Sequence, residues 1–420
     1  MTTAPTLAAN LFDVLSERGF VAQHTRDAAG MRALLAAPQT AYIGFDPTAD
    51  SLHVGSLVPI MGLRWLQACG HRPLVVVGGA TALVGDPSGK TEMRRMLTRE
   101  DIDRNAAAIA AQIGRIVRFD ASATGAKLVN NADWLVGLEW IAMLRAVGPH
   151  FSVNRMLSMD SVKGRLEGGG ISFLEFNYMV MQAYDFVHLF KAEGCALQMG
   201  GQDQWGNIVM GIELGRRTAD AELVGLTMPL VTKSDGGKFG KSEKGNIWLS
   251  AERTPVYEFF QFWRNVADGD VVRFLGFFTD LPMAEVRSLT DGGGEKLNHA
   301  KEVLAFQVTR LVHGEAAAAA ALASAKGAFG AAHDVTGDAI PHSDLPAAEL
   351  AAGLGIVALL VRAKLATSNG EAKRLIEGGG VRVHDIAVTD IGLKIYAAAV
   401  QDGFVLVRAG KKKMHRFDVR

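Results

Sequence analysis

The chain has 420 residues, of which 49% are hydrophobic and 21% charged, and its 44 basic and 44 acidic side chains leave no net charge. This length exceeds one ordinary domain, and the composition excludes a disordered chain; with only 2 cysteines it also excludes a disulfide framework. The N-terminal segment lacks a basic stretch followed by an apolar run, and no apolar stretch is long enough for a membrane helix. We therefore expect a cytoplasmic protein that does not contact a membrane.

The predicted elements begin with short helices in residues 7–37 and continue as alternating strands and helices. A strand at 40–45, a helix at 55–68 and a strand at 73–78 form a βαβ unit, which implies a parallel sheet. Further strands are predicted at 126–130, 195–200 and 223–231, and further helices at 100–119 and 173–190. The expected body is a doubly wound α/β domain with a Rossmann-like parallel sheet.

The C-terminal third is predicted to differ from this body. The expected domains are a catalytic domain at 1–250, an all-helical domain at 251–330, a Gly- and Pro-rich linker at 331–353 and a small α+β domain at 354–420. Residues 356–420 hold 12 basic and 6 acidic side chains, and the rest of the chain is correspondingly acidic. A basic tail on an acidic body suggests a polyanionic partner, although a solvated basic face would have the same composition.

A turn suited to phosphate follows the first predicted strand, in the segment YIGFDPTADSLHVGSL (residues 42–57). Free backbone N–H groups and the helix dipole favour phosphate where a strand leads into a helix. Gly55 leaves room for a nucleotide there, and His53 and Thr48 can donate to phosphate oxygens. A His-x-Gly sequence alone would also suit an ordinary turn.

A second candidate for phosphate binding is the segment KSDGGKFGKS (residues 233–242), in which three lysines alternate with glycines and serines. Such a loop can bring positive charge to developing negative charge, although a solvated hairpin would have a similar composition. The segment GDPSGKT is not a P-loop, because Val84 stands where that pattern requires glycine.

Together the two segments resemble the signatures of class I aminoacyl-tRNA synthetases. The segments GHRPLVVVGGATALVGDPSGK, NYMVMQAYDFVHL and CALQMGGQDQWGNI are similar to the tyrosyl-tRNA synthetases in particular, and this resemblance covers essentially the whole chain. It implies that tyrosine is activated with ATP to tyrosyl-adenylate and pyrophosphate, and then transferred to the 3′ end of its cognate tRNA. It also implies a homodimer, Mg²⁺ that accompanies ATP, and no protein-bound metal.

The resemblance further implies the residues of the site. The residues expected to bind tyrosine are Tyr42, Asp46, Asp86, Tyr178, Gln182, Asp185 and Gln204. The residues expected to bind ATP or act on it are Thr48, His53, Gly55, Ser56, Asp203, Lys238, Lys241 and Ser242. A phenol needs a donor and an acceptor, so Tyr42 and Asp185 are assigned to the substrate hydroxyl.

Two features of this assignment leave alternatives open. The spacing of Tyr178, Gln182 and Asp185 would also suit one face of a buried core helix. The first signature of the family commonly ends in a second histidine, whereas this chain has Ser56, which is shorter and carries no charge.

Residues 366–383 resemble an S4-type RNA-binding module, in which a basic helix leads through glycines into a strand. The residues expected to contact tRNA are Lys373, Arg374, Lys411, Lys412 and Lys413. Three other functions remain possible at this point: a tryptophanyl enzyme of the same fold, an RNA-binding scaffold without catalysis, and a small-molecule adenylyltransferase.

Overall fold

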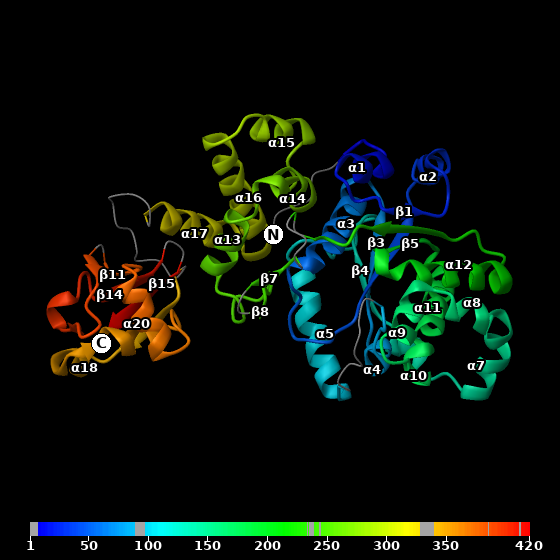
Figure 1. Cartoon of the computed structure of the whole chain (residues 1–420). Coiled ribbons are helices and arrows are strands. Elements are labelled where there is room, and N and C mark those ends of the chain that lie inside the picture. Colours follow the sequence, from blue (N-terminus) through cyan, green and yellow to red (C-terminus); the bar gives the residue numbers. More distant parts are fainter. Residues whose placement is uncertain are drawn as a thin grey trace. The chain divides into compact units, whose positions relative to one another are not determined.

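The computed structural model describes residues 7–88, 97–232, 234, 239–242, 245–327, 340–384, 386–410 and 413–420. The chain divides into two compact units, and Figure 1 shows their elements in chain order. The first unit consists of Met1–Ser250 and Val266–Val312, and the second of Ala251–Asn265 and His313–Arg420. Within the described ranges, no helix has both the length and the apolar character that a membrane crossing demands.

A six-stranded sheet with the order β1-β6-β5-β2-β3-β4 forms the centre of the first unit. Its strands are β1 (Gln23–His24), β2 (Thr40–Phe45), β3 (Arg72–Val77), β4 (Lys127–Asn130), β5 (Cys195–Gly201) and β6 (Val224–Met228). All neighbouring strands are parallel except the short edge strand β1, which is antiparallel to β6. Strand β2 lies between β3 and β5, where the order of the strands reverses. In open α/β sheets, ligands bind at the carboxyl ends of the strands beside such a reversal.

The helices of the first unit include those that pack against this sheet (Figure 1). They are α1 (Leu11–Glu17), α2 (Ala28–Leu34), α3 (Leu57–Ala68), α4 (Thr81–Val84), α5 (Arg99–Ile113), α6 (Ala132–Leu135), α7 (Trp140–Ala146), α8 (Val153–Leu157), α9 (Asp160–Glu167), α10 (Phe173–Phe176), α11 (Tyr178–Glu193), α12 (Trp205–Ala219), α14 (Val271–Phe278), α15 (Met283–Thr290) and α16 (Glu295–His313). Local sequence explains the ends of two helices near the site. Thr98 caps α5 by accepting a hydrogen bond from the backbone N–H of Asp101, and Gly194 ends α11 in the left-handed conformation with φ +64°.

Alternation along β2 decides which of its side chains faces α11. Successive residues of a strand point to opposite faces of the sheet. Tyr42 belongs to the same buried cluster as Leu74 of β3 and Phe186 of α11, and its ring lies 5.4 Å from that of Phe186. The phenol of Tyr42 is thereby placed between the sheet and the helix that carries Asp185.

The second unit contains a five-stranded sheet with the order β12-β11-β14-β15-β9. Its strands are β9 (His342–Leu345), β11 (Val381–Val383), β12 (Ile386–Val388), β14 (Phe404–Ala409) and β15 (Lys413–Val419), and its other elements are α13 (Val256–Arg264), α17 (Glu315–Gly327), α18 (Ala347–Ala352), β10 (Leu354–Gly355), α19 (Ile356–Arg362), α20 (Asn369–Glu377) and β13 (Lys394–Ile395). Leu360, Ile376, Val405 and Phe417 contribute to one buried core between helices and sheet. This is the small α+β fold expected for the C-terminal end.

The predicted elements are confirmed with shifted ends. The helix predicted at 55–68 begins at Leu57, after a 3₁₀ turn over Val54–Ser56, and the helix predicted at 100–119 ends at Ile113, where Gly114 follows. Residues 251–327 are mainly helical as predicted, but these helices belong partly to each unit.

The linker predicted at 331–353 needs correction. Strand β9 and helix α18 both lie within it, and β9 pairs in parallel with β15 through Phe417 and Ser343. Pro341 and Pro346, which contributed to the linker prediction, flank this short strand, and of its residues only Leu345 is buried. Residues 331–339 of the predicted linker lie outside the described residues.

Candidate active site

A cavity of about 660 Å³ lies at the carboxyl ends of β2 and β5. Every residue expected to bind tyrosine lines it, and so do five residues expected to act on ATP, namely Thr48, His53, Gly55, Ser56 and Asp203. Lys238 lies outside the described residues, and Lys241 and Ser242 form strand β7 (Lys241–Ser242), of which only the backbone is described. Among the described residues, no group of His, Cys, Asp or Glu side chains is arranged to hold a metal ion.

The innermost part of the cavity contains Asp185 and Tyr42. The Asp185 carboxylate is 3% exposed and accepts hydrogen bonds from Asn131 Nδ2 at 3.0 Å and Trp134 Nε1 at 2.7 Å. Burial raises the pKa of Asp185 to about 7, although the two donors act in the opposite direction. Burial, together with nearby Asp185, also raises the pKa of Tyr42 well above 10, so its hydroxyl keeps its proton.

The Tyr42 hydroxyl is a buried polar group without a partner among the described residues. Gln198 of β5 also lines the cavity, and its Oε1 is likewise buried without a hydrogen-bond partner among the described residues. Buried polar groups are nearly always hydrogen-bonded, since leaving one unpaired costs about 1–3 kcal/mol. The Tyr42 hydroxyl and Gln198 Oε1 are therefore available to form hydrogen bonds with a polar group of a bound ligand.

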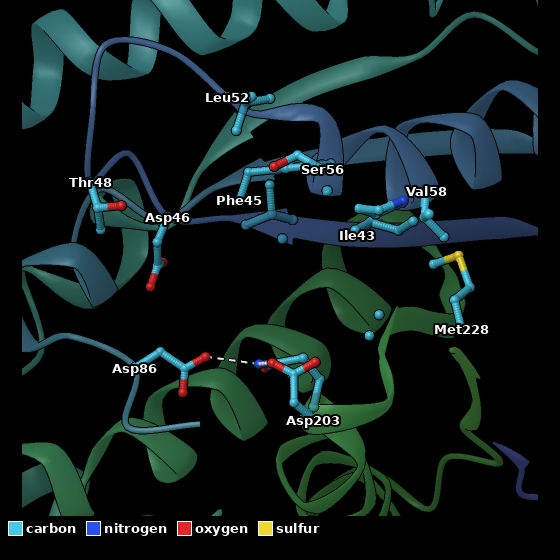
Figure 2. A pocket seen from close by; sticks show the side chains of 18 of the residues that line it. Ile43, Phe45, Asp46, Thr48, Leu52, Ser56, Val58, Asp86, Asp203 and Met228 are labelled. Atoms are coloured by element: carbon cyan, nitrogen blue, oxygen red, sulfur yellow. Dashed lines mark hydrogen bonds between the residues drawn. The ribbon is translucent and has the colours of Figure 1, made fainter. Parts of the chain in front are cut away.

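Carboxylates gather at the middle of the cavity. Asp46 accepts hydrogen bonds from Thr81 Oγ1 at 2.8 Å and from the Tyr178 hydroxyl at 2.9 Å. Asp86 accepts from Gln204 Nε2 at 2.8 Å, and burial followed by nearby Asp46 raises the pKa of Asp86 to about 6. Figure 2 shows Asp46 and Asp86 on opposite sides of this space with their carboxyl groups turned into it. Such a group of acceptors suits a cation, and an ammonium in particular.

Asp203 and Asn207 extend this network. Gln204 Nε2 also donates to Asp203 Oδ2 at 3.1 Å, while Asn207 Nδ2 donates at 3.1 Å both to Gln204 Oε1 and to Gln182 Oε1. The orientation of the Gln182 and Gln204 amides is thus set by one buried asparagine on α12. Tyr178, Gln182 and Asp185 therefore form a polar cavity wall rather than an apolar core stripe.

The outer part of the cavity is formed by the turn of residues 53–56. His53 Nδ1 accepts the backbone N–H of Gly55 at 3.0 Å, and a Cβ on Gly55 would lie 2.8 Å from the His53 ring. Because Nδ1 is an acceptor, the proton of a neutral His53 resides on Nε2, which is then a donor. Ser56 also lines the cavity, and its backbone N–H donates to His53 O at 2.8 Å.

The 53–56 turn contacts the end of the lysine-rich segment. Ile247 donates its N–H to Gly240 O at 2.8 Å and accepts the N–H of Val54 at 3.0 Å. Gly240 has φ +79°, and a Cβ there would lie 2.8 Å from Val54 Cγ2. The two sequence signatures, almost 190 residues apart in the chain, therefore meet at one place.

Sequence reasoning did not name many lining residues of this site, among them Asn131, Thr81, Gln198 and Trp248. Asn131 comes directly after a predicted strand, at the edge of the sheet where the other polar residues gather, and this position was the available signal. Gln198 lies within a predicted strand, where a buried glutamine is an unusual core residue. Thr81 and Trp248 carry no comparable signal in the sequence.

Comparisons with known proteins agree with this geometry. Residues 36–330 match the family described as tRNA synthetases class I (W and Y), and residues 338–417 match the tyrosine–tRNA ligase SYY-like C-terminal domain. The tyrosine–tRNA ligase of Rhizobium meliloti (strain 1021) is 51% identical over 402 residues, which are 95% of this chain and 96% of that protein. That of Rhodospirillum rubrum is 52% identical with the same coverage.

A solved structure supports the same conclusion. A C-terminally truncated mitochondrial tyrosyl-tRNA synthetase from Aspergillus nidulans superposes with a TM-score of 0.68 at 30% identity, over 76% of this chain and 93% of that one. The archaeal tyrosyl-tRNA synthetase from Archaeoglobus fulgidus, at 19% identity and a TM-score of 0.56 over 74% of this chain and 99% of that one, shares the fold. The chain therefore belongs to the tyrosine–tRNA ligase family of class I tRNA synthetases.

Proposed function

We propose that this chain charges tRNA with tyrosine, and that the cavity at the ends of β2 and β5 binds tyrosine and ATP side by side. The observation that carries the proposal is the open Tyr42 hydroxyl, which lies beside the buried acceptor Asp185 at the innermost part of the cavity. A phenol hydroxyl satisfies both groups, because it donates to Asp185 and accepts from Tyr42. The carboxylates of Asp46 and Asp86 then face the substrate ammonium.

The adenylation step follows from this placement. An oxygen of the tyrosine carboxylate attacks the α-phosphorus of ATP, the α–β phosphoanhydride bond breaks, and pyrophosphate leaves. His53 Nε2 and the Thr48 hydroxyl are proposed to donate to the phosphate oxygens, with Lys238 and Lys241 contributing positive charge and Asp203 holding the ribose. Catalysis then consists of orientation and charge stabilisation without a covalent enzyme intermediate. Mg²⁺ enters with ATP as part of that substrate.

The proposal is tested by exchange of labelled pyrophosphate into ATP with the full chain. We expect exchange that depends on tyrosine and is negligible with phenylalanine or tryptophan. Exchange driven equally well by tryptophan would favour the tryptophanyl alternative. No exchange with any amino acid, while tRNA still binds, would favour a scaffold without catalysis.

The raised pKa of Asp86 predicts the pH dependence of tyrosine binding. Below its pKa of about 6 the free Asp86 carboxyl is protonated, and an ammonium binds there only if this proton is released. The KM for tyrosine is therefore expected to rise up to about tenfold per pH unit below about pH 6. Exchange assays across this range measure it. In Asp86→Asn, the KM for tyrosine should be higher at neutral pH, and it should rise less steeply below pH 6. An unchanged rise of KM below pH 6 in that variant would contradict the assignment of Asp86 to the substrate ammonium.

A homodimer is also proposed, and its interface is an apolar patch on α7, α8 and α10. The patch consists of Trp140, Ile141, Leu144, Val153, Leu157, Phe173 and Leu174. Phe173 is 70% exposed and Ile141 65% exposed in the single chain. Patches of this kind on one chain mark interaction surfaces, and a self-complementary patch suits two-fold symmetry.

Sedimentation of Ile141→Asp with Phe173→Asp tests the dimer. We expect the double variant to sediment as a monomer, because two carboxylates buried in an apolar interface have no partners. Val272→Asp, an exposed apolar residue on α14, should remain dimeric. A parent chain that sediments as a monomer would contradict the proposal.

Recognition of tRNA is proposed for the basic side chains of α20 and the start of β15. Lys373 and Arg374 are exposed, since Ala372 and Ile376 fill the buried face of α20. Hydrogen bonds from Thr367 lower the pKa of Glu371, and nearby Lys413 and Arg374 lower it further, so these two cations share one surface. Lys411 and Lys412, also predicted to bind tRNA, lie outside the described residues.

Charge reversal at Lys373 and Arg374 should impair transfer of tyrosine to tRNA without impairing formation of tyrosyl-adenylate. We expect the double glutamate variant to raise the KM for tRNA at least about tenfold and to flatten its salt dependence, because phosphate contacts are lost. Pyrophosphate exchange should remain within about twofold of the parent. The control is Arg287→Glu, an exposed arginine of the first unit. Equal loss of exchange and aminoacylation would contradict a role in tRNA binding.

A further inference from the structure

Helix α5 holds the chain segment that leads into the 53–56 turn. Two amide side chains of α5, spaced seven residues apart and so on one face, bind the backbone of this segment. Asn105 Nδ2, which is buried, donates to Pro47 O at 3.1 Å. Gln112 Oε1 accepts the N–H of Leu52 at 2.9 Å, and Gln112 Nε2 donates to Asp50 O at 3.3 Å.

The contact between Gln112 and Leu52 is the centre of a larger network. The Ser51 hydroxyl lies 3.4 Å from Gln112 Oε1, and it accepts the N–H of Ser250 at 3.1 Å. Leu249 donates its N–H to Leu52 O at 2.8 Å. Both backbone polar groups of Leu52 are thus fixed, one by α5 and the other by the segment that follows β8 (Gly245–Asn246).

Leu52 is the residue directly before His53, and it is 8% exposed. Gln112 does not line the cavity, so it has no direct contact with a ligand bound there. Its effect on His53 passes through one peptide unit. Without Gln112, the partly buried N–H of Leu52 loses its acceptor, and the backbone before His53 is free to move toward another partner.

We propose that Gln112 is a positioning residue for the adenylation step, one that sets the place of His53 through the backbone of Leu52. This inference rests on the function proposed above. A displacement of a catalytic donor by about 1 Å is enough to lower a rate about 100-fold. The structure thus assigns to a residue outside the cavity lining a specific part in arranging the ATP end of the site.

The test compares Gln112→Met with a matched control, Gln67→Met. Gln67 of α3 also anchors backbone with its amide, since Nε2 donates to Arg118 O at 2.7 Å and to Thr124 O at 2.8 Å, and Oε1 accepts from Arg118 N at 2.9 Å. Both variants remove hydrogen bonds that are at least partly buried, those to Leu52 and to Arg118, and should lower the thermal midpoint. Only Gln112→Met should lower kcat for tyrosine-dependent exchange, by about 10- to 100-fold, with KM for tyrosine within about twofold.

Two further variants keep the test decisive. Gln112→Asn, whose amide is one carbon shorter and does not reach Leu52, should lose kcat as Gln112→Met does, and it serves if the methionine variant does not fold. Gln112→Glu keeps an acceptor for the Leu52 N–H and should recover most of the rate. The inference is overturned if Gln112→Met or Gln112→Asn retains kcat within about twofold of the parent, if Gln67→Met loses as much, or if Gln112→Glu recovers nothing. An inactive parent chain would instead refute the proposed function.

Discussion

Replacing Asp185 by asparagine is expected to lower kcat/KM for tyrosine activation by roughly 10²- to 10⁴-fold. The change removes a charge-assisted hydrogen bond to the substrate hydroxyl, worth about 1.5–3 kcal/mol. In the parent chain Asn131 Nδ2 and Trp134 Nε1 donate to the Asp185 carboxylate. The asparagine amide places its own N–H₂ donor opposite one of these two donors. A buried donor left unpaired adds about 1–3 kcal/mol.

Selectivity should fall together with activity. A site built to hydrogen-bond a substrate hydroxyl rejects the analogue without it, and tyrosyl-tRNA synthetases are themselves the standard example of this discrimination. Exchange assays of Asp185→Asn with tyrosine and phenylalanine measure the ratio, with the exposed Asp120→Asn as control. A variant that keeps both the rate and the ratio would exclude Asp185 as the phenol acceptor.

Tyr42→Phe gives an independent view of the same position. Because the Tyr42 hydroxyl has no partner among the described residues, its removal should leave the free energy of unfolding unchanged or higher. The KM for tyrosine should nevertheless rise by up to about tenfold, the value of one neutral hydrogen bond. Loss of binding without loss of stability distinguishes a ligand contact from a core contact.

Replacing His53 by alanine is expected to lower kcat for adenylation by about 10²- to 10³-fold, as removal of one preorganised donor does at other charged transition states. The KM for tyrosine should not change, because His53 is proposed to donate to the phosphates of ATP and not to tyrosine. Single-turnover formation of tyrosyl-adenylate measures the effect. Transfer from preformed adenylate to tRNA should proceed at the parental rate. If transfer slows as much as adenylation, His53 does not act on the ATP phosphates alone.

The sheet was predictable because its strands are short runs rich in apolar residues, as in Thr40–Phe45 and Cys195–Gly201. Strand β1 was not predicted: it has only two residues, and it exists because Gln23 and His24 pair with the backbone of β6 on the side away from β5. Strand β9 was missed for the same reason, since its pairing partner β15 lies about 70 residues away. Pairing across such distances leaves no periodic signal in four residues.

Family resemblance named twelve residues that line the cavity, whereas the side chains of Lys238, Lys241 and Ser242 lie outside what the structure describes. What the sequence did not reveal is how the residues are oriented. The donors Asn131 and Trp134, which hold the Asp185 carboxylate, are 54 and 51 residues away from it in the chain. Gln112 was equally hidden, because a polar residue on an amphipathic helix is expected to face solvent. Its amide instead faces the backbone of Leu52, and only the folded chain shows this.

The central claim is that Asp185 and Tyr42 bind the phenol hydroxyl of tyrosine in the same cavity in which the 53–56 turn binds ATP. A crystal structure of the chain with bound tyrosine tests it most directly. We predict the substrate hydroxyl within hydrogen-bonding distance of Asp185 and the Tyr42 hydroxyl, with the ammonium beside Asp86. Tyrosine bound with its hydroxyl in contact with neither Asp185 nor Tyr42 would contradict the claim.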